Sequence, residues 1–215
     1  MAKFRNPRLD EPTDERPRRP GKREETRTKN RETILDAARR VFAELGYGAT
    51  TVRDIIRATP LASGTFYNYF KSKEEVYQAI RDATALRIRP ALRAARANAG
   101  SLEAFVAGTF RTFFEYVVAE RAGLPAERAK ESLRVRVDTP EIIAGFEELR
   151  EDINKGVARG VFPRADAGFL MAAMAGVAFE VADEMMRRDV PDPAQAAKFA
   201  TALFLGGVSA LPPGT

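Results

Sequence analysis

The side chains with the clearest binding chemistry in this sequence lie in one segment, residues 63–70. The segment reads Ser63-Gly64-Thr65-Phe66-Tyr67-Asn68-Tyr69-Phe70. Hydroxyl and amide groups form hydrogen bonds with phosphates and base edges, so a free helix face that carries them suits nucleic-acid binding. Gly64 also removes a side chain where a nucleic-acid backbone could approach closely, despite its cost in helix propensity.

Catalytic chemistry has little support in the composition. The chain contains no Cys and no His, which removes thiol nucleophiles, disulfides, Cys/His zinc sites, imidazole bases and serine triads. It also lacks a phosphate-binding glycine loop. We therefore expect no catalytic residue, no metal and no cofactor, and we expect that the protein is not an enzyme. An enzyme that uses carboxylates and lysines remains an alternative, and turnover without DNA binding would identify it.

The net charge of the chain is concentrated near its N-terminus. Residues 1–31 carry 11 Lys/Arg and 6 Asp/Glu, a net charge of +5 that equals the charge of the whole chain. Residues 1–27 are polar and proline-containing, and they bury too little apolar surface to offset their ordering entropy. We expect a disordered basic arm, which either follows DNA phosphates or a minor groove or is a solvated tail.

The sequence shows no targeting or membrane signal. Its N-terminus is charged and lacks the apolar stretch of a signal peptide. The longest apolar run, residues 167–179, is too short to span a bilayer and is followed by Glu180. We expect a soluble, cytoplasmic protein.

A long first helix is predicted from Thr28 onward. Its apolar residues recur at spacings of three and four and form one stripe. They are Ile34, Leu35, Ala38, Val41, Phe42 and Leu45. Gly46 then lies at the position where a left-handed residue ends a helix at little cost.

Two shorter helices follow, and they carry the polar segment. Thr51-Val52-Arg53-Asp54 has the pattern of a capping box, which predicts a second helix starting there. Pro60 disfavours a helical conformation for the residue before it and ends that helix. A third helix is predicted over about Ala62 to Phe70, and a fourth begins near Ser72 with a second capping-box pattern, Ser72-Lys73-Glu74-Glu75.

The rest of the chain is predicted to be helical almost throughout. Breaks are expected at Asn98–Gly100, Gly123–Pro125, Thr139–Pro140, Gly160–Pro163 and Asp189–Asp192. Alternating strand patterns and solenoid repeats are absent from the sequence. The predicted fold is all-α. Its parts are a basic arm (1–27), a three-helix helix-turn-helix domain (28–75) and a larger helical effector-binding and dimerisation domain (76–211).

Within the helix-turn-helix, the third helix divides its residues between two roles. Phe66 and Phe70 are four apart and can face a core with Ile55 and Phe42. Thr65, Tyr67, Asn68 and Tyr69 then point elsewhere. The alternative is that both tyrosines are core residues as well. The polar neighbours Asn68, Lys71 and Ser72 argue against that alternative, so we favour tyrosines that face DNA.

Residues 28–80 resemble the DNA-binding domain of the TetR family of bacterial regulators. The residues that carry the resemblance are Ile34-Leu35-Asp36-Ala37-Ala38, Phe42, Gly46-Tyr47, Thr51-Val52-Arg53-Asp54-Ile55 and Gly64-Thr65-Phe66-Tyr67-Asn68-Tyr69-Phe70-Lys71-Ser72-Lys73-Glu74. The resemblance implies a three-helix DNA-binding domain and a larger helical effector-binding domain. It also implies a homodimer that usually represses transcription until a small molecule binds.

The resemblance also assigns roles to individual residues. Thr51 and Arg53 would meet DNA from the start of the second helix. The groove would be faced by Ser63, Gly64, Thr65, Tyr67 and Asn68, and phosphates would be met by Tyr69 and Lys73. The sequence departs from the family pattern in the turn, where Thr59-Pro60-Leu61-Ala62 replaces the usual Ala-Gly-Val-Ser. Ala62 cannot cap the third helix, and Ser63 could cap it instead, starting that helix one residue later.

The last two helices predict a homodimer. Residues 169–179 have no polar face and residues 196–208 are nearly as apolar, so both helices need cover on all sides. Pairing with a second copy in a four-helix interface supplies it, and the resemblance places the dimer interface on the same two helices. The alternative is a monomer with two central helices. A two-fold dimer should bind double-stranded DNA that carries an inverted repeat.

A ligand pocket is expected among the middle helices, about Ser101 to Val181. Its candidate residues are Phe110, Phe113, Phe114 and Glu180. Each aromatic residue could equally be core. Glu180, a carboxylate in an apolar helix, could bind a cationic effector, pair with an arginine such as Arg111, or lie at the helix edge. The sequence does not name the effector.

The predicted mechanism is a population shift. Effector binding would favour a pose in which two DNA-binding domains no longer fit adjacent major grooves. The fourth helix, about residues 72–97, would carry this change because it belongs to both domains. The remaining alternative is a DNA-organising or adaptor protein that needs no small ligand and has no pocket.

Overall fold

The computed structural model describes residues 21–97, 99–122, 124 and 139–208, and every regular element within these ranges is a helix. The helices are α1 (Lys22–Leu45), α2 (Val52–Arg57), α3 (Ser63–Tyr67), α4 (Lys73–Ala97), α5 (Leu102–Arg121), α7 (Pro140–Ala158), α8 (Ala167–Arg187) and α9 (Pro193–Val208). The predicted all-α class is confirmed. None of these helices is long and apolar enough to cross a membrane.

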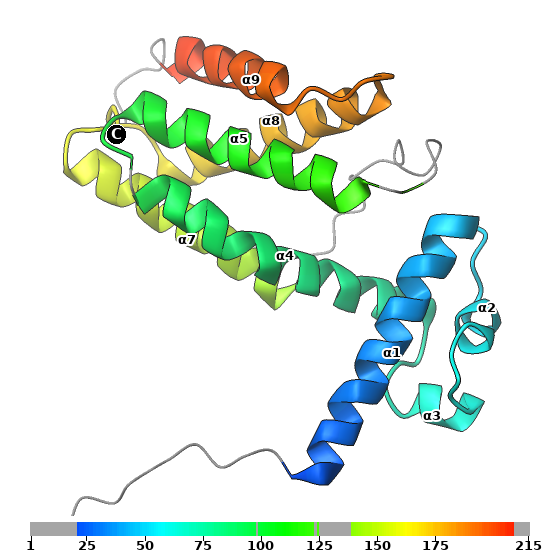
Figure 1. The fold of residues 1–215 in the computed structure, drawn as a ribbon. Helices are drawn as coiled ribbons and strands as arrows, with labels where there is room; N and C mark the ends of the chain where they lie inside the picture. Colours follow the sequence, from blue (N-terminus) through cyan, green and yellow to red (C-terminus); the bar gives the residue numbers. More distant parts are fainter. Residues whose placement is uncertain (1–20, 98, 123, 125–138, 209–215) are drawn as a thin grey trace, which may run out of the picture.

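The described helices form two parts, which we call the head and the body. The head consists of α1, α2, α3 and the first turns of α4, and the body consists of the rest of α4 with α5, α7, α8 and α9 (Figure 1). Each part has its own cluster of buried apolar side chains. Val76 and Ala79 of α4 belong to the head cluster. The domain boundary predicted after residue 75 therefore lies within the first turns of a helix that both parts share.

The first helix begins earlier than the sequence predicted. It starts at Lys22, six residues before Thr28, so residues 22–27 of the predicted disordered arm are helical. Lys, Arg and Glu are good helix formers, and Glu24 and Glu25 in the first turn complement the positive end of the helix dipole. The helix ends as predicted at Gly46, whose φ is 78° and whose N–H donates to the Phe42 carbonyl at 2.9 Å. Residues 1–20 lie outside the described ranges.

The starts of the next helices are set by local hydrogen bonds. The capping box at Thr51 is confirmed: its hydroxyl accepts from the Asp54 N–H at 3.3 Å, and its own N–H donates to the Asp54 carboxylate at 2.9 Å. Before α4, the Ser72 hydroxyl accepts from the Glu75 N–H at 3.3 Å. The Glu75 carboxylate accepts from the Lys71 N–H at 2.7 Å. The second predicted capping box therefore forms only in part: Ser72 caps the helix, but the Glu75 carboxylate accepts from the N–H of Lys71 and not from that of Ser72.

In the body, α5 packs against α4, α8 and α9, and α7 lies beside α4. The predicted breaks agree with the helix ends wherever they fall in the described ranges. Hydroxyl or carboxylate caps start four helices of the body, with Ser101 before α5, Thr139 before α7, Asp166 before α8 and Asp192 before α9. Ion pairs join α4 to α7, and α4 continues through Pro90.

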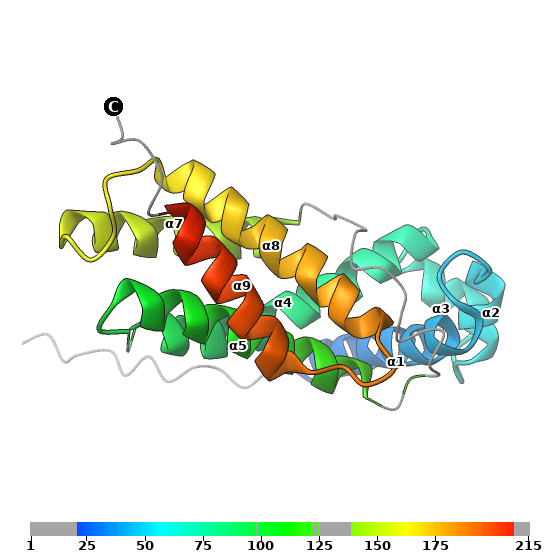
Figure 2. The same cartoon turned by 90° about the horizontal axis from the view of Figure 1, so that it is seen from above.

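Helices α8 and α9 lie together on one side of the body, which Figure 2 shows from above. Their inward residues are buried, but their outward face is exposed in the single chain. Phe169 is 80% exposed, Phe199 59% and Leu203 54%. The two helices predicted to need cover on all sides therefore have it on one side only.

Candidate nucleic-acid interface and body cavity

The head holds its recognition elements on a buried aromatic scaffold. Ile55 is fully buried, and Phe66 and Phe70 are almost so. Phe42 packs against the same cluster and is partly buried. Phe66 and Phe70 lie with ring centroids 6.2 Å apart. The predicted core side of the third helix is confirmed, and it fixes which side chains of α3 face outward.

The outward side of α2 and α3 presents the predicted polar residues. Exposed side chains are those of Thr51, Arg53, Ser63, Tyr67 and Asn68, and Gly64 is exposed as well. Tyr67 is 56% exposed, whereas Thr65 and Tyr69 are half-buried. A Cβ on Gly64 would meet no protein atom within 4 Å. Six of the nine predicted DNA-contact residues are thus exposed on the head, and the contact of all nine with DNA stays a prediction.

The start of α3 differs from the predicted alternative in which Ser63 caps the helix. Ala62 occupies the N-cap position with extended backbone and no side-chain cap, and Ser63 is the first helical residue. The idea that Ser63 caps a later start is therefore wrong. The helix is also shorter than predicted: it ends at Tyr67, and the chain continues as a turn in which the Phe70 N–H donates to the Phe66 carbonyl at 3.1 Å.

Lys73 is engaged within the head. Its ammonium donates to the backbone carbonyls of Tyr47 and Thr50, each at 2.9 Å, and of Gly48 at 3.3 Å. The same group lies 4.7 Å from the centre of the Tyr47 ring. These contacts join the start of α4 to the loop after α1. Any phosphate contact by Lys73 would have to compete with them.

Two carboxylates in the head have perturbed pKa values. The hydroxyl and then the backbone N–H of Thr51 lower the pKa of Asp54. Backbone and Ser72 hydrogen bonds lower the pKa of Glu74, whose carboxylate also accepts from the Tyr47 hydroxyl at 3.2 Å. Burial, followed by the charge of Glu74, raises the pKa of Tyr47. These carboxylates stay ionised at neutral pH and hold the helix starts in place.

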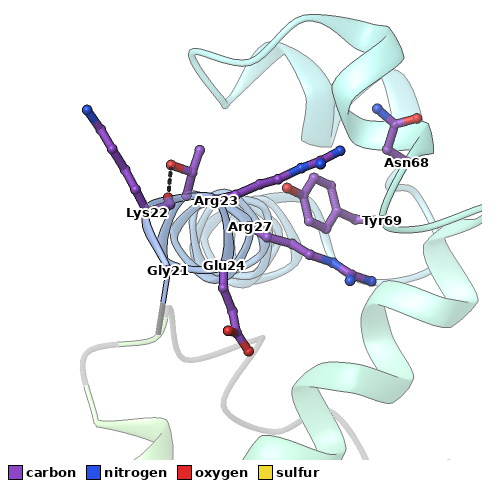
Figure 3. Close-up of a pocket in the computed structure, with 8 residues that line it drawn as sticks. Gly21, Lys22, Arg23, Glu24, Arg27, Asn68 and Tyr69 are labelled. Atoms are coloured by element: carbon purple, nitrogen blue, oxygen red, sulfur yellow. Dashed lines mark hydrogen bonds between the residues drawn. The ribbon is translucent and has the colours of Figure 1, made fainter. Parts of the chain in front are cut away.

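A cleft lies between the first turns of α1 and the end of α3, and the sequence did not predict it. Asn68 and Tyr69 line one side. Arg23 and Arg27 line the other, and Figure 3 shows both pointing toward Tyr69 while Lys22 and Glu24 point elsewhere. The cleft was not predicted because the first helix was expected to begin at Thr28, after these arginines.

The body contains a cavity of about 740 Å³ between α4, α5, α7 and α8, which extends to α1. Three of the four predicted ligand residues, Phe110, Phe113 and Glu180, line it. Phe114 does not: it is fully buried and stacks on Phe110 with centroids 5.9 Å apart. For Phe114 the core alternative is correct.

Glu180 is exposed, and the choice among its three predicted alternatives stays a prediction. Its helix does bury a carboxylate three residues later, at Asp183, which is 3% exposed. The apolar run led the sequence interpretation to Glu180 because that residue ends the run. The position of a carboxylate around the helix, and not its closeness to the apolar run, decides whether it is buried.

Polar groups of the cavity come from α4, α5 and α7, and α4 lies outside the range of residues in which the sequence predicted the pocket. Glu148 forms ion pairs with Arg89 and Arg93. The hydrogen bond from Arg89 holds the pKa of Glu148 well below its usual range, at about 2. Arg96 is almost fully buried and donates to Asp152 at 2.8 Å. Burial raises the pKa of Tyr116, whose hydroxyl donates to the Thr84 carbonyl at 3.3 Å.

Two arginines of the cavity wall, Arg39 and Arg81, each have a buried Nε atom without a hydrogen-bond partner among the described residues. A buried donor without an acceptor costs free energy, so each of these atoms is a point where a bound molecule could contribute an acceptor. The arginines of α4 were not predicted as cavity residues, because their spacing in the sequence does not show which side of the helix faces a cavity.

Comparison with known proteins gives a consistent result. The model of the family of bacterial regulatory proteins called tetR matches residues 34–80. The chain is 30% identical to the transcriptional regulator TcmR of Streptomyces glaucescens over 155 residues, which is 69% of this chain and 66% of TcmR. It is 39% identical to the transcriptional repressor AcnR of Corynebacterium glutamicum over 61 residues, 28% of this chain and 32% of AcnR.

A solved structure extends the similarity to most of the fold. The fatty acid degradation regulator FadR of Bacillus halodurans has a TM-score of 0.65 and 24% sequence identity, with 83% of this chain and 96% of that chain covered. At this identity the likeness concerns the fold. With AcnR the match spans only about a third of the relative's length.

Proposed function

Because the chain belongs to the TetR family of bacterial regulatory proteins, we propose that it is a ligand-responsive transcriptional repressor. It binds a palindromic operator as a homodimer and is released by a small-molecule effector. The carrying observation is the head: a buried scaffold of Ile55, Phe66 and Phe70 presents the polar side of α3 to solvent.

The exposed side of α3 suits the major groove. Tyr67 and Asn68 point outward with hydroxyl and amide groups that form hydrogen bonds with base edges. Ser63 and Gly64, at the start of the helix, are small and leave room for a backbone. Arg53 of α2 adds a cation on the same side. We propose that α3 provides sequence recognition and that α2 contributes backbone contacts.

The outward face of α8 and α9 supports the homodimer. Phe169, Phe199 and Leu203 are exposed there, and the small residues Ala172 and Gly176 of α8 are exposed as well. Contiguous exposed apolar surface marks an interface. Two-fold pairing of this face would give a four-helix interface. The two heads of such a dimer would bind the halves of an inverted repeat.

The cavity supports an effector that acts through α4. Its wall includes Phe42 of α1 and Tyr77 of α4 at the head end, and Phe113 in the body. A bound molecule would therefore touch both parts of the chain. An effector that fits the space is largely apolar and carries an acceptor for Arg81. The cavity also favours this proposal over a DNA-organising protein that needs no ligand.

Selection of binding sites from random duplex DNA tests the proposal. The expected result is a palindrome with two half-sites, and recovery of no preferred sequence would overturn it. In the same assay, Tyr67→Ala and Asn68→Ala should weaken binding to the selected site more than binding to random duplex. Equal losses on both would mean that α3 does not read the sequence.

A further inference from the structure

Three arginines form a row along one side of the first turns of α1. Arg23, Arg27 and Arg31 follow each other at a spacing of four residues, which places them on the same side of a helix. The guanidinium carbon of Arg31 lies 5.6 Å from the centre of the Phe70 ring. Arg23 and Arg27 extend the row away from the core and line the cleft beside Tyr69 (Figure 3).

The row has no anionic partner among the described residues. No carboxylate lies within 4 Å of any of its three guanidinium groups there, and all three residues are exposed. Like charges at this spacing repel, and the positive end of the helix dipole adds to that repulsion. Glu24 also lines the cleft but points away from Tyr69. The cleft therefore concentrates positive charge that a bound anion would neutralise.

We propose that Arg23 and Arg27 bind the phosphate backbone of DNA beside the half-site that α3 occupies. This inference rests on the proposed function and adds a second DNA contact to it. DNA is the anion that fits, because Asn68 and Tyr69 of the cleft directly follow the exposed Tyr67 of α3. The stacking of Arg31 on Phe70 fixes the row against the recognition scaffold.

The contact is independent of base sequence. Arginine forms charge-assisted, bidentate hydrogen bonds with phosphate. Each neutralised phosphate contributes about 0.9 to the slope of log K against log salt on duplex DNA. Loss of both arginines should therefore lower that slope by about two and weaken all duplexes alike.

The same helical stretch supplies a matched control. Lys22 and Lys29 are exposed and carry the same two charges, but their helical positions lie away from the arginine row. Figure 3 shows Lys22 pointing away from Tyr69. The pair Lys22→Gln/Lys29→Gln removes as much charge as Arg23→Gln/Arg27→Gln and keeps Arg23, Arg27 and Tyr69 in place, although the Lys22 position also borders the cleft.

The test measures binding of the full chain to the selected operator and to random duplex at several KCl concentrations. R23Q/R27Q should lose about 10- to 100-fold on both DNAs at 0.1 M salt, with a slope lower by about two. K22Q/K29Q should change neither quantity appreciably. R23K/R27K, which keeps the charges, should keep the slope even if the glutamine pair disturbs α1.

The outcomes separate this inference from the proposed function. Equal effects of the arginine and lysine pairs, or an unchanged slope in R23Q/R27Q, would overturn the phosphate contact while leaving operator recognition in place. If R23K/R27K loses as much slope as R23Q/R27Q, charge is not the cause and the inference fails as well. If the wild-type chain shows no operator preference, the proposed function itself fails.

Discussion

The head and the body present their sites in different ways. In the head, a single short helix presents both a buried scaffold residue and an exposed polar side, so Phe66 lies inward and its neighbour Tyr67 outward. In the body, the cavity is lined by side chains from several helices that are far apart in the sequence. The local sequence of one helix can therefore predict a site on its surface, whereas a cavity depends on how helices distant in the sequence pack together.

The largest expected effect is the loss of stability when a buried phenylalanine is removed from the core of the head or of the body. Phe66→Ala removes the ring that the head cluster encloses and should cost about 3–5 kcal/mol, because Phe66 is 1% exposed. Phe114→Ala, at an equally buried site in the body, should cost a similar amount. Urea unfolding, followed by circular dichroism and operator binding, measures both. Phe66→Ala should abolish binding at urea concentrations where the body stays folded. One shared transition in both variants would show that the regions unfold together.

The next effect concerns the ion pair that joins α4 to α7. Because the pKa of Glu148 is lowered to about 2 from the ordinary value of 4.5, the folded state favours the ionised carboxylate. Its contribution is complete above about pH 4.5 and is lost as the pH falls toward 2. Glu148→Gln should therefore lower stability at pH 7 by up to about 3 kcal/mol. The difference from wild type should shrink between pH 4.5 and 2.

Glu147→Gln is the matched control for this pair. Glu147 is half exposed and pairs with Arg150 along the same helix, so its loss should cost at most about 1 kcal/mol. Thermal unfolding from pH 2 to 7 distinguishes the two variants. A constant difference between wild type and Glu148→Gln across this range would contradict the lowered pKa.

How far the sequence predicts each region follows from the same contrast. The helix-turn-helix, its scaffold and its exposed residues could be predicted because capping boxes, Gly46 and the spacing of Phe66 and Phe70 are local signals. The polar wall of the cavity could not, because Arg81 and Glu148 acquire their roles only when α4 meets α7. Phe113 and Phe114 are adjacent in the sequence, yet only Phe113 lines the cavity.

A smaller effect is expected at Lys73, where one substitution distinguishes a structural role from a contact with DNA. Lys73→Met removes three hydrogen bonds to backbone carbonyls and should destabilise the head by about 1–3 kcal/mol. If its role is structural, the variant at low temperature keeps the wild-type salt dependence of DNA binding. A slope lower by about one, with unchanged stability, would instead identify a phosphate contact.

The smallest expected effect is a gain at the start of α3. Ala62 occupies the N-cap position with φ of −67° and ψ of 149°, a conformation that serine adopts readily, and it provides no side-chain cap. Ala62→Ser supplies an oxygen for a free N–H in the first turn and should raise the stability of the head by about 0.5–1 kcal/mol. Urea unfolding of the head measures the gain, and Ala62→Val, which cannot cap, is the control. Equal stability of the two variants would mean that the short helix is held by Phe66 and Phe70 alone. The head would then owe its recognition surface to its core and not to its helix start.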